Sequence, residues 1–406
     1  MKAWVKSVCL LATSLALAAS GRAIDPGADV ANVTATTPIY VAVNQDIAFP
    51  TPNAVGFFQA SGTQLLNQND VDTGGYGIQG GFFGMQRVNS IPSLSAPCVY
   101  VSDGGSNDIA AISLPGQQPM GTFSGSDSDD GSSDGIGLAV NSHYLYAGYS
   151  ASGTIATFSL QGNCGLTFLG DIAAVGLQGG PPQAMAANGN ILVVAYGDGS
   201  IQSFNVSNGI PVSNGDLQNS TAYLASRTHP TPSSVDISQN GQYAIFGDIG
   251  PYNQIEVSSL ASGKLAKTVT YLLGVPYDAG AVRLSPDQHL LYIANSESGT
   301  IYAAFFNATT GVITRGCTSP VLSGFNSRPW LGAIATRDTT GTGTVLYVAE
   351  YGRDYIEVNH GPSSAIAILN VTSTGTACTL KEATGSPQLL SFPGSLSIGV
   401  YPPRPF

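Results

Sequence analysis

Leu291-Tyr292-Ile293-Ala294 belongs to a short motif that decides the fold, because it occurs seven times along the chain. Each copy is an apolar run, usually with a Tyr, followed by a polar or glycine-rich turn and a second apolar run. The copies are Ile39-Tyr40-Val41-Ala42, Val99-Tyr100-Val101-Ser102, Leu145-Tyr146-Ala147-Gly148, Leu192-Val193-Val194-Ala195, Ala244-Ile245-Phe246-Gly247, Leu291-Tyr292-Ile293-Ala294 and Leu346-Tyr347-Val348-Ala349. Their second residues, 40, 100, 146, 193, 245, 292 and 347, lie 46 to 60 residues apart. Short strands at a period of about 40–50 residues are typical of β-propellers with four strands to a blade. Seven copies therefore predict an all-β, seven-bladed β-propeller.

The sixth copy shows the expected anatomy of a blade. Residues 281–284 are an apolar inner strand, a, and residues 290–294 are strand b. Strand c follows at 300–306, and strand d begins at Val312. The strands are rich in Val, Ile, Tyr, Phe and Thr, which suit a pleated, half-buried surface.

The first blade lacks an inner strand before Tyr40, but a spare strand, Ser395–Val400, follows the seventh blade. We expect this strand to pair with Ile39–Val43 and to close the ring, which removes a free sheet edge. Residues 38–406 are then one domain.

Parts of the sixth repeat resemble a known family. The stretches that carry the resemblance are Ser285-Pro286-Asp287, Leu291-Tyr292-Ile293-Ala294-Asn295, Gly299-Thr300-Ile301 and Thr309-Thr310-Gly311-Val312-Ile313. They are similar to the repeat of YVTN-type and lactonase-type (6-phosphogluconolactonase-like) seven-bladed propellers. The resemblance spans about residues 38–401 and is sharp in blades six and seven. It implies the propeller fold and a site for a small sugar lactone or sugar acid at the channel mouth.

The sequence departs from the family where catalysis is concerned. Lactonase-type propellers commonly carry Pro-Arg-His or Pro-His just before an inner strand. The corresponding positions here are Pro232-Ser233-Ser234, Pro182-Gln183-Ala184 and Arg328-Pro329-Trp330, without His. Only Arg328, with Glu350, Arg353 and His229, is available to rebuild such a cluster.

The N-terminus has the pattern of a secretory signal peptide. Lys2 and Lys6 precede an apolar run, Val8–Ala19, that is too short to cross a membrane. Small residues offer cleavage after Ala18 or Ala23. We expect residues 1–23 to be the signal, residues 24–37 to be an N-terminal extension, and the mature protein to be secreted, extracellular or periplasmic, without membrane insertion.

The composition narrows the choice of partners. Charged residues make up 10% of the chain, against a usual ~25%. The formal net charge of −11 should repel nucleic acid and anionic lipid. The expected partners are a small molecule, a glycan or an extracellular protein, and the expected oligomeric state is a monomer.

Cysteine and acidic residues suggest structural rather than metal sites. Cys98, Cys164, Cys317 and Cys378 remain after signal removal, and four cysteines in an oxidising compartment allow three disulfide connectivities. No pair has metal-ligand spacing, so no metal or cofactor is expected. One acidic d–a connection could bind Ca²⁺ through oxygen ligands, or it could be a solvated loop. Its carboxylates are Asp127, Asp129, Asp130 and Asp134.

The d–a and b–c connections of a propeller lie on one face, where ligands usually bind. Asp103, Asp248 and Glu350 are expected to begin b–c turns, and the seventh b–c connection, Glu350–His360, is a charged insertion. Long polar connections on a rigid scaffold concentrate binding residues, although such a loop can also pair its own charges. The candidate catalytic residues are Glu350, His229 and Arg328; the candidate ligand-binding residues are Arg227, Tyr277, Asp278, Trp330, Arg353 and His360.

The sequence leaves three functions open: a lactonase-like hydrolase, a non-catalytic propeller that binds a glycan or protein, and a cell-surface structural protein.

Two charged residues lie in inner strands of the expected blades. Asp236 and Arg283 occupy equivalent positions in neighbouring blades, where a lone buried charge is costly. We expect each to have a partner or to line the channel, and Arg283→Leu to cost several kcal/mol if Arg283 is buried and paired.

Overall fold

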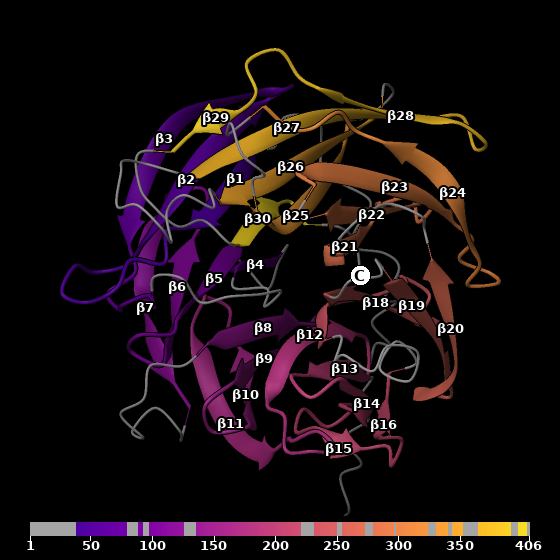
Figure 1. Cartoon of the computed structure of the whole chain (residues 1–406). Coiled ribbons are helices and arrows are strands. Elements are labelled where there is room, and N and C mark those ends of the chain that lie inside the picture. The colour runs from indigo at the N-terminus through magenta and orange to yellow at the C-terminus, as the bar shows by residue number, and fades with distance from the viewer. Residues whose placement is uncertain are drawn as a thin grey trace, which may run out of the picture. The chain divides into compact units, whose positions relative to one another are not determined.

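Seven antiparallel sheets, each of four or five strands, lie around a common axis in this computed structural model (Figure 1). The structure describes residues 38–78, 88–91, 97–125, 135–220, 231–249, 254–272, 279–295, 298–323, 330–339, 343–351, 364–390 and 397–403. Contacts divide the chain into Met1–Thr37 and Pro38–Phe406, and all seven sheets belong to the second unit. The predicted seven-bladed propeller is confirmed.

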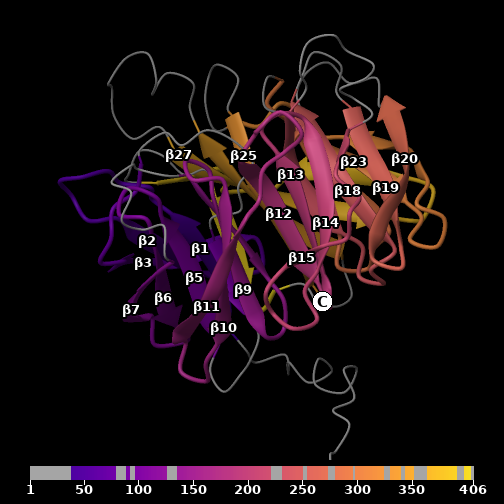
Figure 2. The ribbon, with the colours of Figure 1, turned by 90° about the horizontal axis from the view of Figure 1, so that it is seen from below.

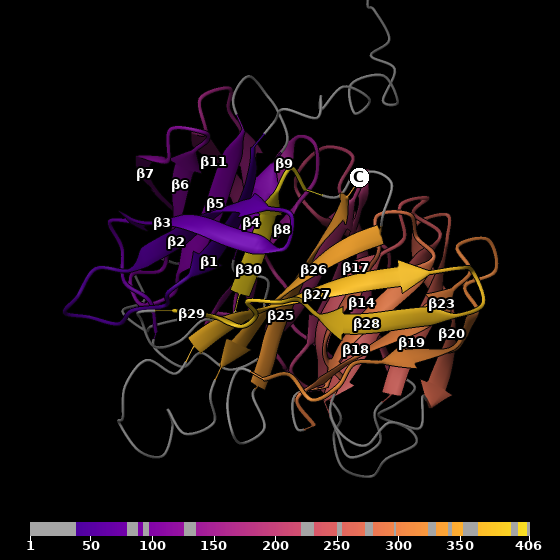
Figure 3. The ribbon, with the colours of Figure 1, turned by 90° about the horizontal axis from the view of Figure 1, so that it is seen from above.

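Blade one joins the two ends of the repeat region. It contains β1 (Ile39–Asn44), β2 (Ala54–Ser61), β3 (Gln64–Asp72) and β30 (Ser397–Tyr401), in the order β3-β2-β1-β30. Figure 3 shows β30, in yellow, beside β1, in indigo. Val41 pairs with Val400 and Val43 with Ile398, so the C-terminal strand supplies the inner strand of the first blade, as predicted.

The other six blades each run outward from an inner strand, as β12, β13 and β14 show in Figure 1, and Figure 2 shows the same strands after a 90° turn. Blade two contains β4 (Val88–Ile91), β5 (Cys98–Asp103), β6 (Asp108–Ser113) and β7 (Gln118–Ser124). Blade three contains β8 (Ile136–Val140), β9 (Tyr144–Tyr149), β10 (Thr154–Leu160) and β11 (Leu166–Ala173). Blade four contains β12 (Pro182–Asn188), β13 (Ile191–Tyr196), β14 (Ser200–Asn205), β15 (Val212–Ser213) and β16 (Gln218–Asn219).

The last three blades follow the same scheme. Blade five contains β17 (Thr231–Ile237), β18 (Tyr243–Ile249), β19 (Gln254–Ala261) and β20 (Lys264–Leu272). Blade six contains β21 (Ala279–Leu284), β22 (Leu290–Asn295), β23 (Thr300–Phe306) and β24 (Ile313–Thr318). Blade seven contains β25 (Trp330–Thr339), β26 (Gly343–Tyr351), β27 (Ser364–Ser373), β28 (Cys378–Glu382) and β29 (Gln388–Leu389). Within the described ranges, no helix has the length and apolar character needed to cross a membrane.

The hydrophobic core lies between the blades. The buried apolar residues form seven clusters, and each cluster draws on two neighbouring blades. Side chains alternate between the two faces of a strand, so strand b of each blade contributes side chains to the clusters on both sides of that blade. In blade three, Tyr146 packs towards blade four, whereas Leu145 and Ala147 pack towards blade two. The second residue of the motif, a Tyr in five of the seven copies, therefore fills the junction with the next blade, and the motif is repeated because each junction is filled in this way.

Two disulfides reinforce two of these junctions. Cys98 at the start of β5 is bonded to Cys164, which links blades two and three. Cys317 in β24 is bonded to Cys378 in β28, which links blades six and seven. Of the three connectivities that the sequence allowed, the structure has Cys98–Cys164 with Cys317–Cys378.

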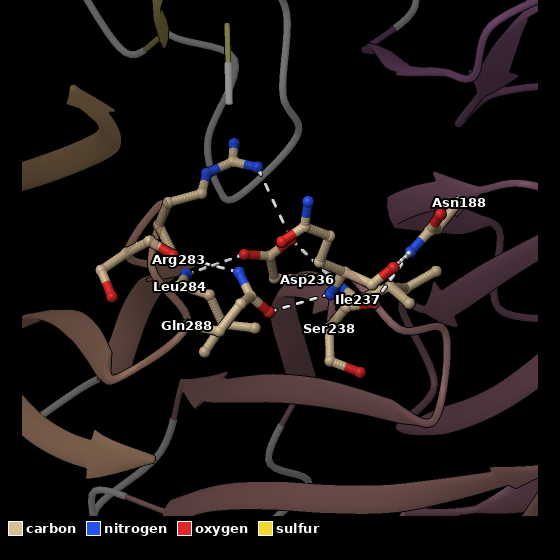
Figure 4. A network of polar contacts seen from close by, with 9 residues as sticks. Asn188, Asp236, Ile237, Ser238, Arg283, Leu284 and Gln288 are labelled. Atoms are coloured by element: carbon tan, nitrogen blue, oxygen red, sulfur yellow. Dashed lines mark hydrogen bonds and ion pairs between the residues drawn. The ribbon is translucent and has the colours of Figure 1, made fainter. Parts of the chain in front are cut away.

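The two charged inner-strand residues pair across the junction of blades five and six (Figure 4). Asp236 is 2% exposed, and its carboxylate accepts hydrogen bonds from the backbone N–H of Ile237 (2.9 Å) and of Leu284 (2.8 Å). Arg283 Nη1 lies 3.8 Å from Asp236 Oδ1, and its side chain is 23% exposed. The expectation that each charge has a partner is confirmed. Because Arg283 is partly exposed, however, the ion pair itself contributes little.

Candidate functional site

One position of the repeat is polar in most blades although it is buried in all of them. It is the residue directly after each motif copy, which we call the b-terminal position: Val43, Asp103, Tyr149, Tyr196, Asp248, Asn295 and Glu350. All seven are at most 1% exposed. The sequence places the start of a turn at the three acidic members, but the structure keeps them in β5, β18 and β26 because the strand ladder continues through them.

The b-terminal side chains point towards the preceding blade. Tyr149 packs in the cluster between blades two and three, and Tyr196 in the cluster between blades three and four. By the same alternation, Glu350 shares a face with Val348, which packs between blades six and seven. In three blades a carboxyl group thus replaces the Val, Tyr or Asn side chain that fills this place in the other four.

Glu350 is the candidate site residue that the structure describes best. It is 0% exposed, and its backbone lies between Leu331 of β25 and Ala365 of β27. Neither carboxyl oxygen has a hydrogen-bond partner among the described residues. Burial, and then the negative charge of Glu382, raise the pKa of Glu350 to about 8. The group is therefore a neutral acid near pH 7 and retains a proton that it can donate.

Asp248 repeats this situation in blade five. It is 1% exposed, and both of its oxygens lack a partner within the described ranges. Burial and then the charge of Glu256 raise its pKa well above the ordinary value. Sequence analysis missed Glu256, although one signal was available: it is an acidic residue in the middle of strand c, flanked by the buried Ile255 and Val257.

Few of the other predicted site residues fall within the described residues. The backbone of Trp330 pairs with Tyr351, one step from the pair of Leu331 with Glu350, so β25 and β26 do bring these two candidate positions together. Seven candidates lie outside the described residues: Arg227, His229, Tyr277, Asp278, Arg328, Arg353 and His360. The acidic connection that contains Asp127, Asp129, Asp130 and Asp134 also lies outside them. The described residues contain no group of three or more His, Cys, Asp or Glu side chains placed to bind a metal ion.

Ser233, which follows Pro232 where the family resemblance implies Arg or His, has a structural role in blade five. Ser233 is fully buried, and its hydroxyl lies 3.2 Å from the carbonyl oxygen of Gly247, 3.3 Å from that of Ala279 and 3.0 Å from that of Gly280. It therefore ties blade five to the inner strand of blade six. A hydroxyl engaged with backbone carbonyls in this way does not replace an imidazole as a general base.

A glycine-rich d–a connection is occupied by a carboxylate of the chain itself. Asp198 Oδ2 accepts hydrogen bonds from the N–H groups of Gln178 (2.7 Å) and Gly180 (3.1 Å), and Ser200 donates to Oδ1. Burial tends to raise the pKa of Asp198, but these hydrogen bonds lower it below its usual value. The N–H groups of this connection are therefore bound by a side chain of the protein itself and are not available to a phosphate.

Comparison with known proteins identifies the family. The family model "Lactonase, 7-bladed beta-propeller" matches residues 99–388. The chain belongs to the lactonase family of seven-bladed propellers. The predicted family resemblance is thus confirmed, and no curated protein matches the chain.

Solved structures support the fold of this lactonase-family chain. A candidate 6-phosphogluconolactonase from Bacteroides fragilis is 15% identical, with a TM-score of 0.64 over 91% of this chain and 99% of that one. A protein from Lactobacillus plantarum is 16% identical, with a TM-score of 0.60 over 90% and 99%. A candidate 6-phosphogluconolactonase from Bacteroides uniformis is 14% identical, with a TM-score of 0.58 over 89% and 99%. At such identities the likeness shows the fold alone.

Proposed function

We propose that this protein is an exported lactonase-family hydrolase that opens a small sugar lactone, with Glu350 as its general acid. One observation carries the proposal: Glu350 is a buried carboxyl with no partner among the described residues and a pKa of about 8, at the b-terminal position. A group that retains its proton at neutral pH suits the protonation of a leaving oxygen.

The chemistry requires one proton donor and groups that stabilise negative charge. Water adds to the lactone carbonyl, and the ring C–O bond then breaks as Glu350 donates its proton to the leaving ring oxygen. The Glu350 carboxylate recovers a proton from the added water, and the product is a hydroxy acid whose own carboxyl proton goes to solvent. In this proposal Arg328 and Arg353 bind the anionic product, because a chain of net charge −11 would otherwise repel it.

The ligand in this proposal lies on the face of the d–a and b–c connections, next to blade seven. His229, Arg227, Tyr277, Asp278, Trp330 and His360 are the further residues assigned to its binding. Because Glu350 is fully buried in the free protein, this proposal requires the bound ligand to reach the carboxyl while keeping water away from it, since burial is what holds the proton there. The proposal therefore predicts a loss of turnover, rather than a loss of binding alone, when this carboxyl is replaced.

Export belongs to the same proposal. The N-terminal pattern of residues 1–23 and the two disulfides support an oxidising compartment outside the cytoplasm. We propose a monomer, since the apolar side chains of the described b strands are buried in the seven junctions between blades. The further partners that fit a polar protein with few charged residues and a net negative charge are a glycan or an extracellular protein.

A second function is favoured by Ser233. Its hydroxyl is engaged with carbonyl groups of the inter-blade junction, so a position where the family resemblance implies a catalytic side chain holds a structural one here. A non-catalytic propeller that binds a glycan or protein on the same face is therefore the alternative. It predicts ligand binding without acid release.

The test is acid release from a panel of aldonolactones, with and without a 6-phosphate, followed in a pH-stat. We expect Glu350→Gln to lower kcat by about 10²–10⁴-fold and wild-type activity to fall above a pH of about 8. Asp103→Asn is the matched control, because Asp103 occupies the same b-terminal position, equally buried, in blade two. An unchanged kcat in Glu350→Gln would contradict the assignment. Binding of a lactone or sugar acid without any turnover would favour the non-catalytic alternative.

A further inference from the structure

The turn between β5 and β6 in blade two brings two carboxyl groups together. Asp103 ends β5, Asp108 begins β6, and the two residues are cross-strand partners. Asp103 Oδ2 and Asp108 Oδ1 are buried, and neither has a hydrogen-bond partner among the described residues. A Cβ built on Gly75 would lie 2.5 Å from the first of these oxygens, 2.7 Å from the second and 2.6 Å from Ser106 Oγ, so three side-chain oxygens surround one point. The two carboxyl groups are close enough to form a hydrogen bond with each other.

The Ser106 hydroxyl donates a hydrogen bond to the Asp108 carboxyl, but it is neutral and does not compensate the repulsion between two ionised carboxyl groups. The other Asp103 oxygen, Oδ1, already accepts a hydrogen bond from Asn53 Nδ2 at 2.6 Å. The neighbouring described segments add the acidic Asp46 and Asp72 and the phenol of Tyr76, but no Lys, Arg or His. Between Pro38 and Gly125 the sequence has one cationic residue, Arg87, which lies outside the described residues. Two adjacent buried carboxylates without a cation are costly, and one shared proton removes that cost.

The pair lies where two blades are joined by backbone contacts. The d–a connection that leaves blade one, Thr73–Ile78, packs with its Gly75 against the two carboxyls. The N–H of Tyr76 donates to Ser106 Oγ (2.9 Å), and the N–H of Gly105 donates to the carbonyl of Tyr76 (2.7 Å). A Cβ at residue 75 would displace the ends of the Asp103, Ser106 and Asp108 side chains, so Gly75 allows the backbone of this connection to lie close to the pair. The contact between the blades therefore depends on the state of the carboxyl pair.

We propose that Asp103 and Asp108 share one proton, which Asp103 Oδ2 donates to Asp108 Oδ1, and that this proton stabilises the contact of the Thr73–Ile78 connection of blade one with blade two. Loss of the proton to solvent leaves two adjacent carboxylates, Asp103 fully buried and Asp108 half-buried, and their repulsion separates the 103–108 turn from the connection.

The pH at which this contact is lost follows from the surroundings of Asp103. Burial raises the pKa of Asp103 to about 7, against the hydrogen bond from Asn53 and with a smaller contribution from the charge of Asp108. Burial also raises the pKa of Asp108. An acid whose pKa is higher in the folded state stabilises that state below its unfolded pKa, and the contribution is lost as the pH rises through the folded pKa. The connection therefore contacts the 103–108 turn at acidic pH and separates from it at mildly alkaline pH.

The experiment compares the wild type with Asp103→Asn at pH 5.5 and 8.5. Asn at this position reproduces the protonated state, since its carbonyl accepts from Asn53 and its amide donates to Asp108 at every pH. Urea unfolding should show that the folding equilibrium constant of the wild type falls about 30-fold more than that of the variant, from a pKa of 3.8 raised to about 7. Hydrogen exchange should locate the change in peptides that cover 73–78 and 103–108. Asp70→Asn, an exposed carboxylate in β3, is the control and should behave as the wild type.

Two outcomes would overturn the proposal. Parallel loss of stability and of protection in the wild type and in Asp103→Asn would show that the pair does not govern the contact. Recovery of protection at pH 8.5 on addition of Ca²⁺ or Mg²⁺, in the wild type alone, would show that a divalent cation and not a proton joins the two carboxylates. Should Asp103→Asn fail to fold, Asp108→Asn makes the same test, because its amide donates to Asp103 and removes the like charge.

Discussion

Replacing Asp236 with Asn should destabilise the propeller far more than replacing its partner Arg283 with Leu. We expect Asp236→Asn to lower the free energy of unfolding by about 2–4 kcal/mol, and Arg283→Leu to lower it by about 1 kcal/mol or less. The sequence alone predicts several kcal/mol for Arg283→Leu, on the condition that Arg283 is buried.

The difference follows from the contacts of each side chain. Asp236 is 2% exposed, and its two oxygens accept from the N–H groups of Ile237 and Leu284 on neighbouring blades. The amide of Asn keeps one acceptor, so one buried N–H loses its partner at a cost of about 1–3 kcal/mol, and the remaining hydrogen bond is weaker by about 1 kcal/mol because its acceptor is no longer charged. Arg283 is 23% exposed and 3.8 Å from Asp236, so its removal takes away a solvent-screened ion pair while both backbone donors remain (Figure 4).

Urea unfolding at neutral pH, followed by far-UV circular dichroism and by intrinsic fluorescence, measures both values. Asp287→Asn, in the exposed a–b turn of blade six, is a suitable control for the removal of a carboxylate from that face. If Arg283→Leu proves as costly as Asp236→Asn, the ion pair rather than the backbone hydrogen bonds joins the two blades, and the reasoning is refuted.

Three further outcomes are expected. Deletion of residues 395–406 removes β30 and exposes the edge of β1, so the melting temperature should fall and aggregation should appear in light scattering; an unchanged melting temperature would contradict closure of the ring. Cys98→Ala/Cys164→Ala opens a link between residues 66 apart and should cost about 2–4 kcal/mol in urea unfolding, whereas an equal stability with and without reductant would argue against the bond. The wild type should lose stability as the pH rises from 5 through about 8, because folded Glu350 holds a proton that the unfolded chain has released, and Glu350→Gln should lose less over the same range. Identical pH profiles of the melting temperature in the two proteins would show that Glu350 does not titrate in this range.

The candidate site was only partly accessible to sequence reasoning. Glu350 was identified because it begins a charged insertion, but its significance comes from burial and from the absence of a partner among the described residues. The carboxyl pairs Asp103–Asp108 and Asp248–Glu256 were not found, since each joins residues from two strands and depends on strand register. Strand ends were likewise misplaced by a residue or two, because pairing with both neighbouring strands extends β26 through Tyr351.

The sequence by itself determined the number of blades, the four-strand scheme and the closure by the C-terminal strand. These follow from local periodicity, because every blade must bury the same apolar faces between its neighbours and therefore repeats the same motif. It left open which cysteines pair, whether Asp236 and Arg283 meet, and which carboxyls keep a proton. Only the tertiary structure decided these points, because the distance between two side chains, and the water excluded around them, depend on how strands from different parts of the chain are brought together.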